Sequence, residues 1–292
     1  MKKIFFRIAA LLSLTVITYS ACQKDDYKKE STAASTTSVE ENALADETFT
    51  DIFADLAGLA HDDEGPFSSI KKRKSEKIFT DVNDSLDDHQ HNFGCADVTV
   101  APEGTKWPKT VTVDFGTGCT HHGITKKGKI IAVFSNDFRI DSSKINISFD
   151  GFYVNDHKIE GTSTITNKGE NISGNHEFTI EIKNGKIIGN KTLSWSSMKT
   201  IEWAKGIDKT SPLDDKLRIT GTASGINTAG KNFTVNITKH LVRPVVCPFF
   251  TEGTLEVKQA DNTLILDYGE GTCDNEATVT VNGQSIDIEL KK

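Results

Sequence analysis

Over residues 95–292, apolar and polar residues alternate with a period of two, and this pattern constrains the fold more than any other feature. Clear runs lie at 110–115, 145–149, 178–182 and 233–237. Successive side chains of a β-strand point to opposite faces, so each run predicts a strand with one buried and one solvated face. The abundant β-branched Thr and Ile residues favour such strands. We therefore expect this region to be an all-β body of antiparallel, β-sandwich-like sheets.

Turn signals and internal repeats indicate how the strands are organised. Asn184-Gly185 and Asn282-Gly283 each separate two alternating runs and predict tight hairpin turns. Two pairs of segments resemble each other, namely 113–119 with 266–273, and 159–163 with 219–223. Because each copy carries its own alternating runs, we expect a duplicated β unit whose two copies share one domain.

The first repeat has a Gly-x-Gly sequence, which invites comparison with a phosphate site. Gly116 and Gly118 are followed by Cys119 and strand-like or loop sequence. A dinucleotide site needs a helix directly after its glycines, because the helix N-terminus faces the pyrophosphate. We therefore predict a tight turn or a bulge at a strand end.

The cysteines indicate disulfides. The chain has five cysteines, four of them in the β region. An even number in an exported protein indicates disulfide bonds, and four cysteines allow three pairings. The repeat selects the pairing of Cys95 with Cys119 and of Cys247 with Cys273. The alternative is a four-thiolate zinc site, but such sites usually present close Cys-x-x-Cys pairs.

An amphipathic helix is expected over residues 39–60. Apolar residues recur there at helical spacing, at Phe49, Ile52, Phe53, Leu56 and Leu59. The opposite face carries Asp46, Glu47, Asp51 and Asp55. We expect the apolar stripe to pack on the β body, because a membrane-surface helix prefers basic residues on its polar face. Residues 22–38 are expected to be a flexible tether and residues 61–94 a polar linker.

Residues 1–21 are expected to be a signal peptide. Lys2, Lys3 and Arg7 precede an uncharged apolar run at 8–17, which is about half as long as a membrane-spanning helix. The segment that follows, Thr18-Tyr19-Ser20-Ala21-Cys22, resembles a lipobox. The resemblance implies cleavage before Cys22 and acylation of that cysteine by palmitate-type fatty acids. Two or three acyl chains anchor a protein firmly to a membrane.

Two shorter motifs bear on location. The segment 23–26, Gln-Lys-Asp-Asp, resembles the export signal of surface lipoproteins in Bacteroidota. It implies an outer-membrane protein facing the cell surface, with the periplasmic face as the alternative. Asp84-Ser85-Leu86 resembles an O-glycosylation motif of some Bacteroidota and implies modification of Ser85. The paired cysteines and the repeated strand end resemble those of uncharacterised Bacteroidota lipoproteins, a likeness that brings no activity with it.

Charge and motif content narrow the function. The net charge is −7, and the basic cluster at 71–74 lies in a polar stretch, so no nucleic-acid partner is expected. The sequence contains no Gly-x-Ser-x-Gly, no His-Glu-x-x-His and no P-loop. His121 and His122 would point to opposite faces of a strand, and His89 and His91 lie in the expected linker. We therefore predict no metal or other cofactor.

Trp195 and Trp203 are the candidate glycan contacts. If residues 193–203 form one strand, both indoles share a face with Leu193 and Ile201. Exposed tryptophans can stack on sugar rings, whereas these apolar neighbours favour packing in the core.

The sequence leads to two hypotheses from different classes. The first is a lipid-anchored envelope protein with a non-enzymatic binding or structural β module. Its partners would be the membrane, through the lipid, and an extracellular glycan or protein. The second is a hydrolase acting on an extracellular glycan or other polymer, which would need a surface cleft holding two carboxylates with perturbed pKa values.

Overall fold

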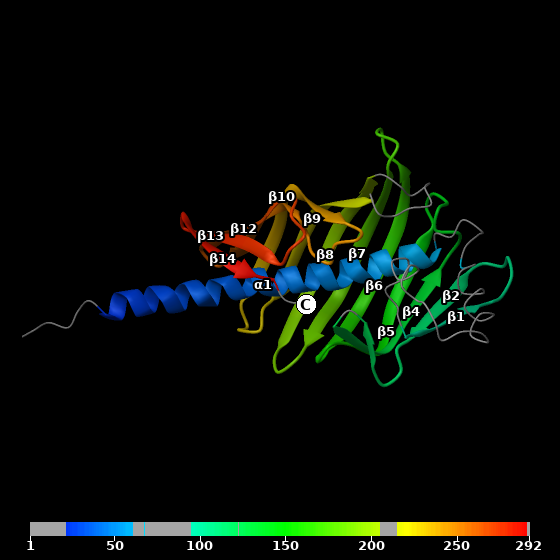
Figure 1. Cartoon of the computed structure of the whole chain (residues 1–292), viewed down its shortest axis with the longest axis horizontal. Coiled ribbons are helices and arrows are strands. Elements are labelled where there is room, and N and C mark those ends of the chain that lie inside the picture. The colour runs from blue at the N-terminus through cyan, green and yellow to red at the C-terminus, as the bar shows by residue number, and fades with distance from the viewer. Residues whose placement is uncertain (1–21, 61–66, 68–94, 122, 205–214, 291–292) are drawn as a thin grey trace, which may run out of the picture.

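The protein is a single curled β-sheet wrapped around one long helix (Figure 1). The computed structural model describes residues 22–60, 67, 95–121, 123–204 and 215–290, with side chains from residue 36 onward. The predicted signal peptide, most of the linker, Ser85, His89, His91 and His122 lie outside the described residues.

The sheet has 14 strands, all paired antiparallel. They are β1 (Asp97–Ala101), β2 (Lys109–Asp114), β3 (Cys119–His121), β4 (Ile124–Phe134), β5 (Lys144–Val154), β6 (His157–Glu170), β7 (His176–Ile188), β8 (Thr192–Ala204), β9 (Lys216–Ile226), β10 (Asn232–Pro244), β11 (Glu252–Gln259), β12 (Asn262–Glu270), β13 (Glu276–Val281) and β14 (Gln284–Glu289). Strands that are consecutive in sequence are neighbours in the sheet, with one exception: β2 pairs with β4. The short strand β3 pairs only with β4. The antiparallel all-β body is thereby confirmed, with one continuous sheet in place of two sandwich layers.

The helix α1 (Cys22–Ala60) fills the inside of the curl. In Figure 1 it crosses the strands at the middle of the sheet, and the C-terminal strands β12–β14 lie beside the same helix. Phe49 stacks on Trp195 of β8, and Phe53 packs against Phe178 of β7. The helix also contacts β11, β12 and β13. Strands that are far apart in the order of the sheet therefore bury a common helix.

Glycines at β-bulges allow the sheet to curl this tightly. Gly161 in β6 and Gly221 in β9 occupy equivalent positions of the second repeat and have φ values of 117° and 132°. A Cβ atom on Gly221 would lie 2.3 Å from the carbonyl oxygen of Met198, and one on Gly161 would lie 2.8 Å from the Cα of Gly185. The strand register shifts beside both glycines. Bulges bend the strand that carries them, so the repeat marks two bends of the sheet.

The two Asn-Gly signals have different outcomes. Asn282 and Gly283 both have positive φ and join β13 to β14, which confirms that hairpin turn. The hairpin predicted at Asn184-Gly185 is wrong, because both residues lie inside β7 at a register shift against β8. Gly185 is needed there because the neighbouring strand passes within 2.8 Å of where its Cβ would lie. The same dipeptide thus serves a bulge instead of a turn.

The Gly-x-Gly segments end strands, as predicted. β2 ends at Asp114, whose Oδ1 accepts a hydrogen bond from the backbone N–H of Gly116 over 2.9 Å. In the second copy, Asp267 Oδ1 accepts from the N–H of Gly269, also over 2.9 Å. The aspartate of the repeat therefore makes the same local hydrogen bond in both copies, at a turn after β2 and at a register shift near the end of β12.

Both predicted disulfides are present, so the repeat identified the pairing correctly. Cys95–Cys119 ties a residue two positions before β1 to the start of β3, and Cys247–Cys273 links the β10–β11 and β12–β13 connections. The Cα–Cα distances are 5.6 Å and 5.9 Å.

The helix departs from the prediction in two respects. It ends at Ala60, as predicted, but begins at Cys22, so the flexible tether predicted over 22–38 is wrong. This segment contains neither glycine nor proline, and its continuity with the buried part extends the helix. The acidic face is buried too, because the sheet covers the helix on that side as well.

Candidate functional site

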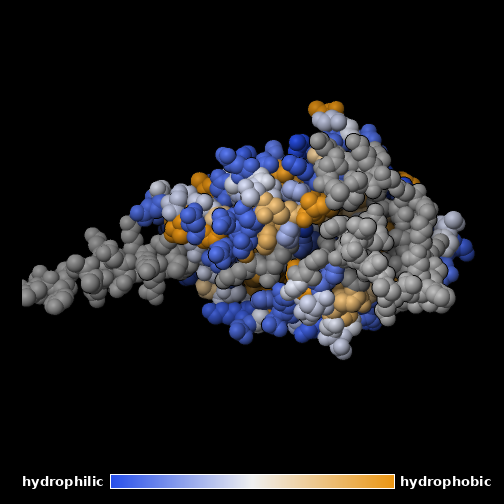
Figure 2. All heavy atoms as spheres, in the orientation of Figure 1, coloured by the Kyte–Doolittle hydropathy of each residue, from blue (hydrophilic) through white to orange (hydrophobic). Residues whose placement is uncertain are grey.

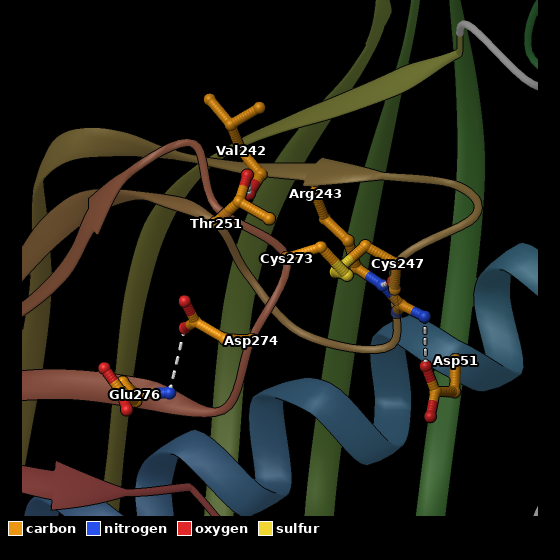
Figure 3. The surroundings of a disulfide bond; sticks show 8 residues. All are labelled: Asp51, Val242, Arg243, Cys247, Thr251, Cys273, Asp274 and Glu276. Atoms are coloured by element: carbon orange, nitrogen blue, oxygen red, sulfur yellow. Dashed lines mark hydrogen bonds and ion pairs between the residues drawn. A yellow bond between two sulfur atoms is a disulfide. The ribbon is translucent and has the colours of Figure 1, made fainter.

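Three ion pairs fix the helix inside the sheet. Asp46 pairs with Lys199 of β8, Asp51 with Arg243 of β10, and Asp55 with Lys126 of β4. The last two pairs have N–O distances of 2.5 Å and 3.1 Å. Figure 3 shows Arg243 beside the Cys247–Cys273 disulfide, reaching Asp51 on the helix. The acidic face of α1 is thus ion-paired to three separate strands, and these pairs fix the position of the helix relative to the sheet.

The interior is closed enough to perturb proton affinities. Burial raises the pKa of the Asp46 carboxyl above its ordinary value, although Lys199 opposes the shift. The pKa of Tyr268, on β12, lies well above its ordinary value, because the ring is buried and Asp46 and Glu47 are negatively charged. The Tyr268 hydroxyl has no hydrogen-bond partner among the described residues. Asp46 and Tyr268 therefore lie in the core, out of reach of a polymer.

The two candidate tryptophans also belong to the core. Trp195 and Trp203 are 3% and 6% exposed. The indole Nε1 of Trp195 donates to Asn42 Oδ1 over 3.0 Å, and that of Trp203 donates to Asp215 Oδ2 over 2.9 Å. The glycan-contact interpretation of these residues is wrong, and the core interpretation is confirmed. The reason is that the face they share with Leu193 and Ile201 is covered by the helix.

An open groove of about 620 Å³ lies across β7–β11, on the face of the sheet that points away from the helix. Its lining is formed mainly by the outward-facing residues of these strands and also includes the buried residues Ile182, Ser197, Ala223 and Val235. We call it the outer groove. The bulge glycines Gly185 and Gly221 stand next to it along β7 and β9, where bulges increase the local twist.

The strand register places the groove side chains in rows. Glu181, Met198, Thr222, Asn236 and Glu256 are successive partners across β7, β8, β9, β10 and β11. Ser196, Ser224, Thr234 and Lys258 form the adjacent row. Met198, at 49% exposure, is the one large apolar side chain exposed in this groove.

Ion pairs stand at both ends of the groove. Glu181 pairs with Lys183 on β7, and Glu256 pairs with Lys258 on β11, each with an N–O distance of 2.9 Å. The sequence analysis did not single out these residues. A signal for these ion pairs is present in the sequence as two matching tripeptides, Glu-Ile-Lys at 181–183 and Glu-Val-Lys at 256–258. Each lies in a stretch where apolar and polar residues alternate.

The predicted acylation site lies at the far end of the helix. Cys22 is the first residue of α1, and the helix extends well beyond the body (Figure 1). On the face that Figure 2 shows, hydrophilic residues cover much of the described part, with apolar residues in small groups between them. Within the described ranges, no group of three or more His, Cys, Asp or Glu side chains is arranged to hold a metal ion.

The helix in the described part of the chain is not apolar enough over a sufficient length to cross a bilayer. Comparison with protein-family models, with curated proteins and with solved structures finds no match.

Proposed function

We propose that the protein is a lipid-anchored component of the bacterial outer membrane that faces the cell surface, and that its β body binds a ligand or partner without catalysis. The observation that carries the proposal is the continuous helix from Cys22, the residue of the lipobox resemblance, into the centre of the sheet.

The helix suits an anchor because it joins the acylation site to the core without a flexible hinge. Between Cys22 and Ser38, the first fully buried residue of the described side chains, the helix rises about 24 Å at 1.5 Å per residue. Acylation at Cys22 would therefore hold the body at a set distance from the membrane. In that position the groove would be accessible to molecules outside the bilayer.

The binding role is supported by the outer groove, and two observations make it a better candidate than a hydrolytic site. The carboxyl group with a raised pKa, Asp46, is buried beside Lys199. The groove carboxylates, Glu181 and Glu256, are each paired with a lysine and stand on strands separated by three others. Hydrolysis of a glycoside needs two carboxyl groups about 5–10 Å apart, whereas four strand spacings are about 19 Å.

Metabolic labelling tests the anchor. A clickable fatty acid should label the wild-type chain in a Bacteroidota host, and Cys22→Ser should abolish the label because the acceptor thiol is gone. Ser31→Ala, in the same helix, is the matched control and should label normally. Equal labelling of wild type and Cys22→Ser would refute the lipid anchor, and protease protection of the body on intact cells would refute its surface location.

A further inference from the structure

We infer that the outer groove binds an extended, uncharged, hydroxyl-rich polymer, that is, a neutral glycan chain lying across β7–β11. The inference names the ligand class of the binding role proposed above and rests on it. It involves residues of the solvent-facing side of the sheet and not the buried tryptophans.

The floor of the groove offers unused hydrogen-bonding groups. Ser196, Thr222, Ser224, Thr234 and Asn236 line it. Within the described part of the chain, none of these five side chains is hydrogen-bonded to another group. Each hydroxyl both donates and accepts, and the amide does so through separate atoms. This matches a chain of sugar hydroxyls, which also donate and accept along their whole length.

The charges of the groove select against charged polymers. The lining has two carboxylates and two ammonium groups, and the ion pairs of Glu181 with Lys183 and of Glu256 with Lys258 neutralise them locally. A polyanion or polycation therefore finds no excess of the opposite charge, and it would have to break these pairs to gain one. The pairs stand about 19 Å apart, four inter-strand spacings, which leaves an uncharged floor between them.

The position of the groove disfavours a peptide. Peptides that extend a sheet need a free strand edge, but β8, β9 and β10 are paired on both sides. The groove provides Met198 as its single large exposed apolar side chain, next to Glu181 in the row from Glu181 to Glu256. One flexible thioether fits the apolar face of a sugar ring, whereas a peptide motif needs several apolar pockets.

Met198 supplies a native reporter for the test. The chain has two methionines, Met1 and Met198, so methyl-¹³C-methionine labelling of the full chain in detergent micelles gives at most two methyl signals. Met198→Leu assigns the signal of the groove. The probes are the neutral oligosaccharides cellohexaose, maltohexaose and N-acetylated chitohexaose, compared with anionic oligogalacturonate and cationic deacetylated chitosan oligomers of similar length.

The expected result is a saturable shift of the Met198 methyl signal with at least one neutral oligosaccharide and weaker binding of both charged ones. Thr222→Val keeps the shape of the side chain and removes its hydroxyl, so affinity should fall about fivefold. Thr166→Val, on the solvent side of β6 outside the groove, is the matched control and should leave affinity unchanged.

Three results would overturn the inference: no shift with any neutral probe, tighter binding of a charged probe, or equal effects of Thr222→Val and Thr166→Val. Fatty-acid labelling of the same preparation separates this outcome from failure of the proposed function. If the chain is labelled by the fatty acid but binds no glycan, the assignment of the groove is wrong and the lipid anchor is still supported.

Discussion

Lys199→Met should destabilise the protein strongly, because it leaves the Asp46 carboxylate buried without its cation. The side chains of Lys199 and Asp46 are 7% and 0% exposed. Removing one partner of a buried ion pair costs about 3–5 kcal/mol of unfolding free energy, because the remaining charge cannot return to water. Methionine is unbranched and fills the lysine site, so lost packing adds little. We expect a loss of about 4 kcal/mol.

Urea unfolding followed by tryptophan fluorescence measures this loss. The Lys199 ammonium lies 5.5 Å from the centre of the Trp195 ring, so the probe reports from the site itself. A second substitution, Asp46→Asn, removes the stranded charge and keeps an oxygen that accepts from Asn42, so the double variant should recover much of the stability. Lys129→Met, at the exposed pair with Asp114, is the control and should unfold like wild type.

The size of the loss should depend on pH. Burial already raises the pKa of Asp46, and without Lys199 its folded-state pKa rises further. The folded variant then keeps this proton at pH values where the unfolded chain releases it. The difference from wild type should therefore be smallest below the ordinary pKa of aspartate and grow as the pH rises through the folded-state pKa. A loss below about 1 kcal/mol at neutral pH, or no recovery in the double variant, would refute the reasoning.

Three further predictions concern the buried Tyr268, the bulge at Gly221 and the Cys247–Cys273 disulfide. Tyr268 keeps its proton in the folded protein beyond the ordinary phenol pKa, so unfolding free energy should decrease as the pH rises above about 10, and Tyr268→Phe should remove that decrease; identical alkaline profiles would contradict this. Gly221→Ala places a Cβ 2.3 Å from the Met198 carbonyl oxygen and should cost about 3 kcal/mol in urea unfolding, whereas Gly118→Ala, whose Cβ would lie 4.0 Å from Cγ2 of Thr125, should be neutral. Replacing Cys247 and Cys273 together by Ser opens a loop of 26 residues and should cost about 3.5 kcal/mol in urea unfolding without a reducing agent; unchanged stability would contradict this.

The local part of the fold could be predicted because its causes lie within a few residues. Period-two alternation identified the strands, and the duplicated strand end identified the disulfide partners. The turn at Asn282-Gly283 needs only two residues with positive φ, which this dipeptide favours.

The errors arose where the cause lies far away in the chain. Asn184-Gly185 has the same local signal, but the backbone of Trp195 on β8 passes close to Gly185 and makes the site a bulge. The acidic face of the helix is buried because distant strands cover it. Lys126, which pairs with Asp55 of the helix, follows it by 71 residues in the sequence. Trp195 became a core residue for the same reason.

The outer groove combines a local feature that is visible in the sequence with an arrangement that depends on distant strands. The tripeptides Glu-Ile-Lys at 181–183 and Glu-Val-Lys at 256–258 are visible in the sequence and place both charges of each pair on one face of a strand. Their arrangement at opposite ends of a polar floor depends on the order of five strands. The hollowing depends on bulges that the sequence alone did not locate.

Among the described elements, the helix is the first to leave the ribosome, and it is also the last to gain its surroundings. Ser38 is hydrogen-bonded to Asn227 and Gln259, which lie 189 and 221 residues later. Contacts at such separations form slowly, since a long loop must close before they contribute. A nascent chain therefore cannot complete its interior until nearly all strands have been made, which would keep it unfolded for the export that the proposed function requires.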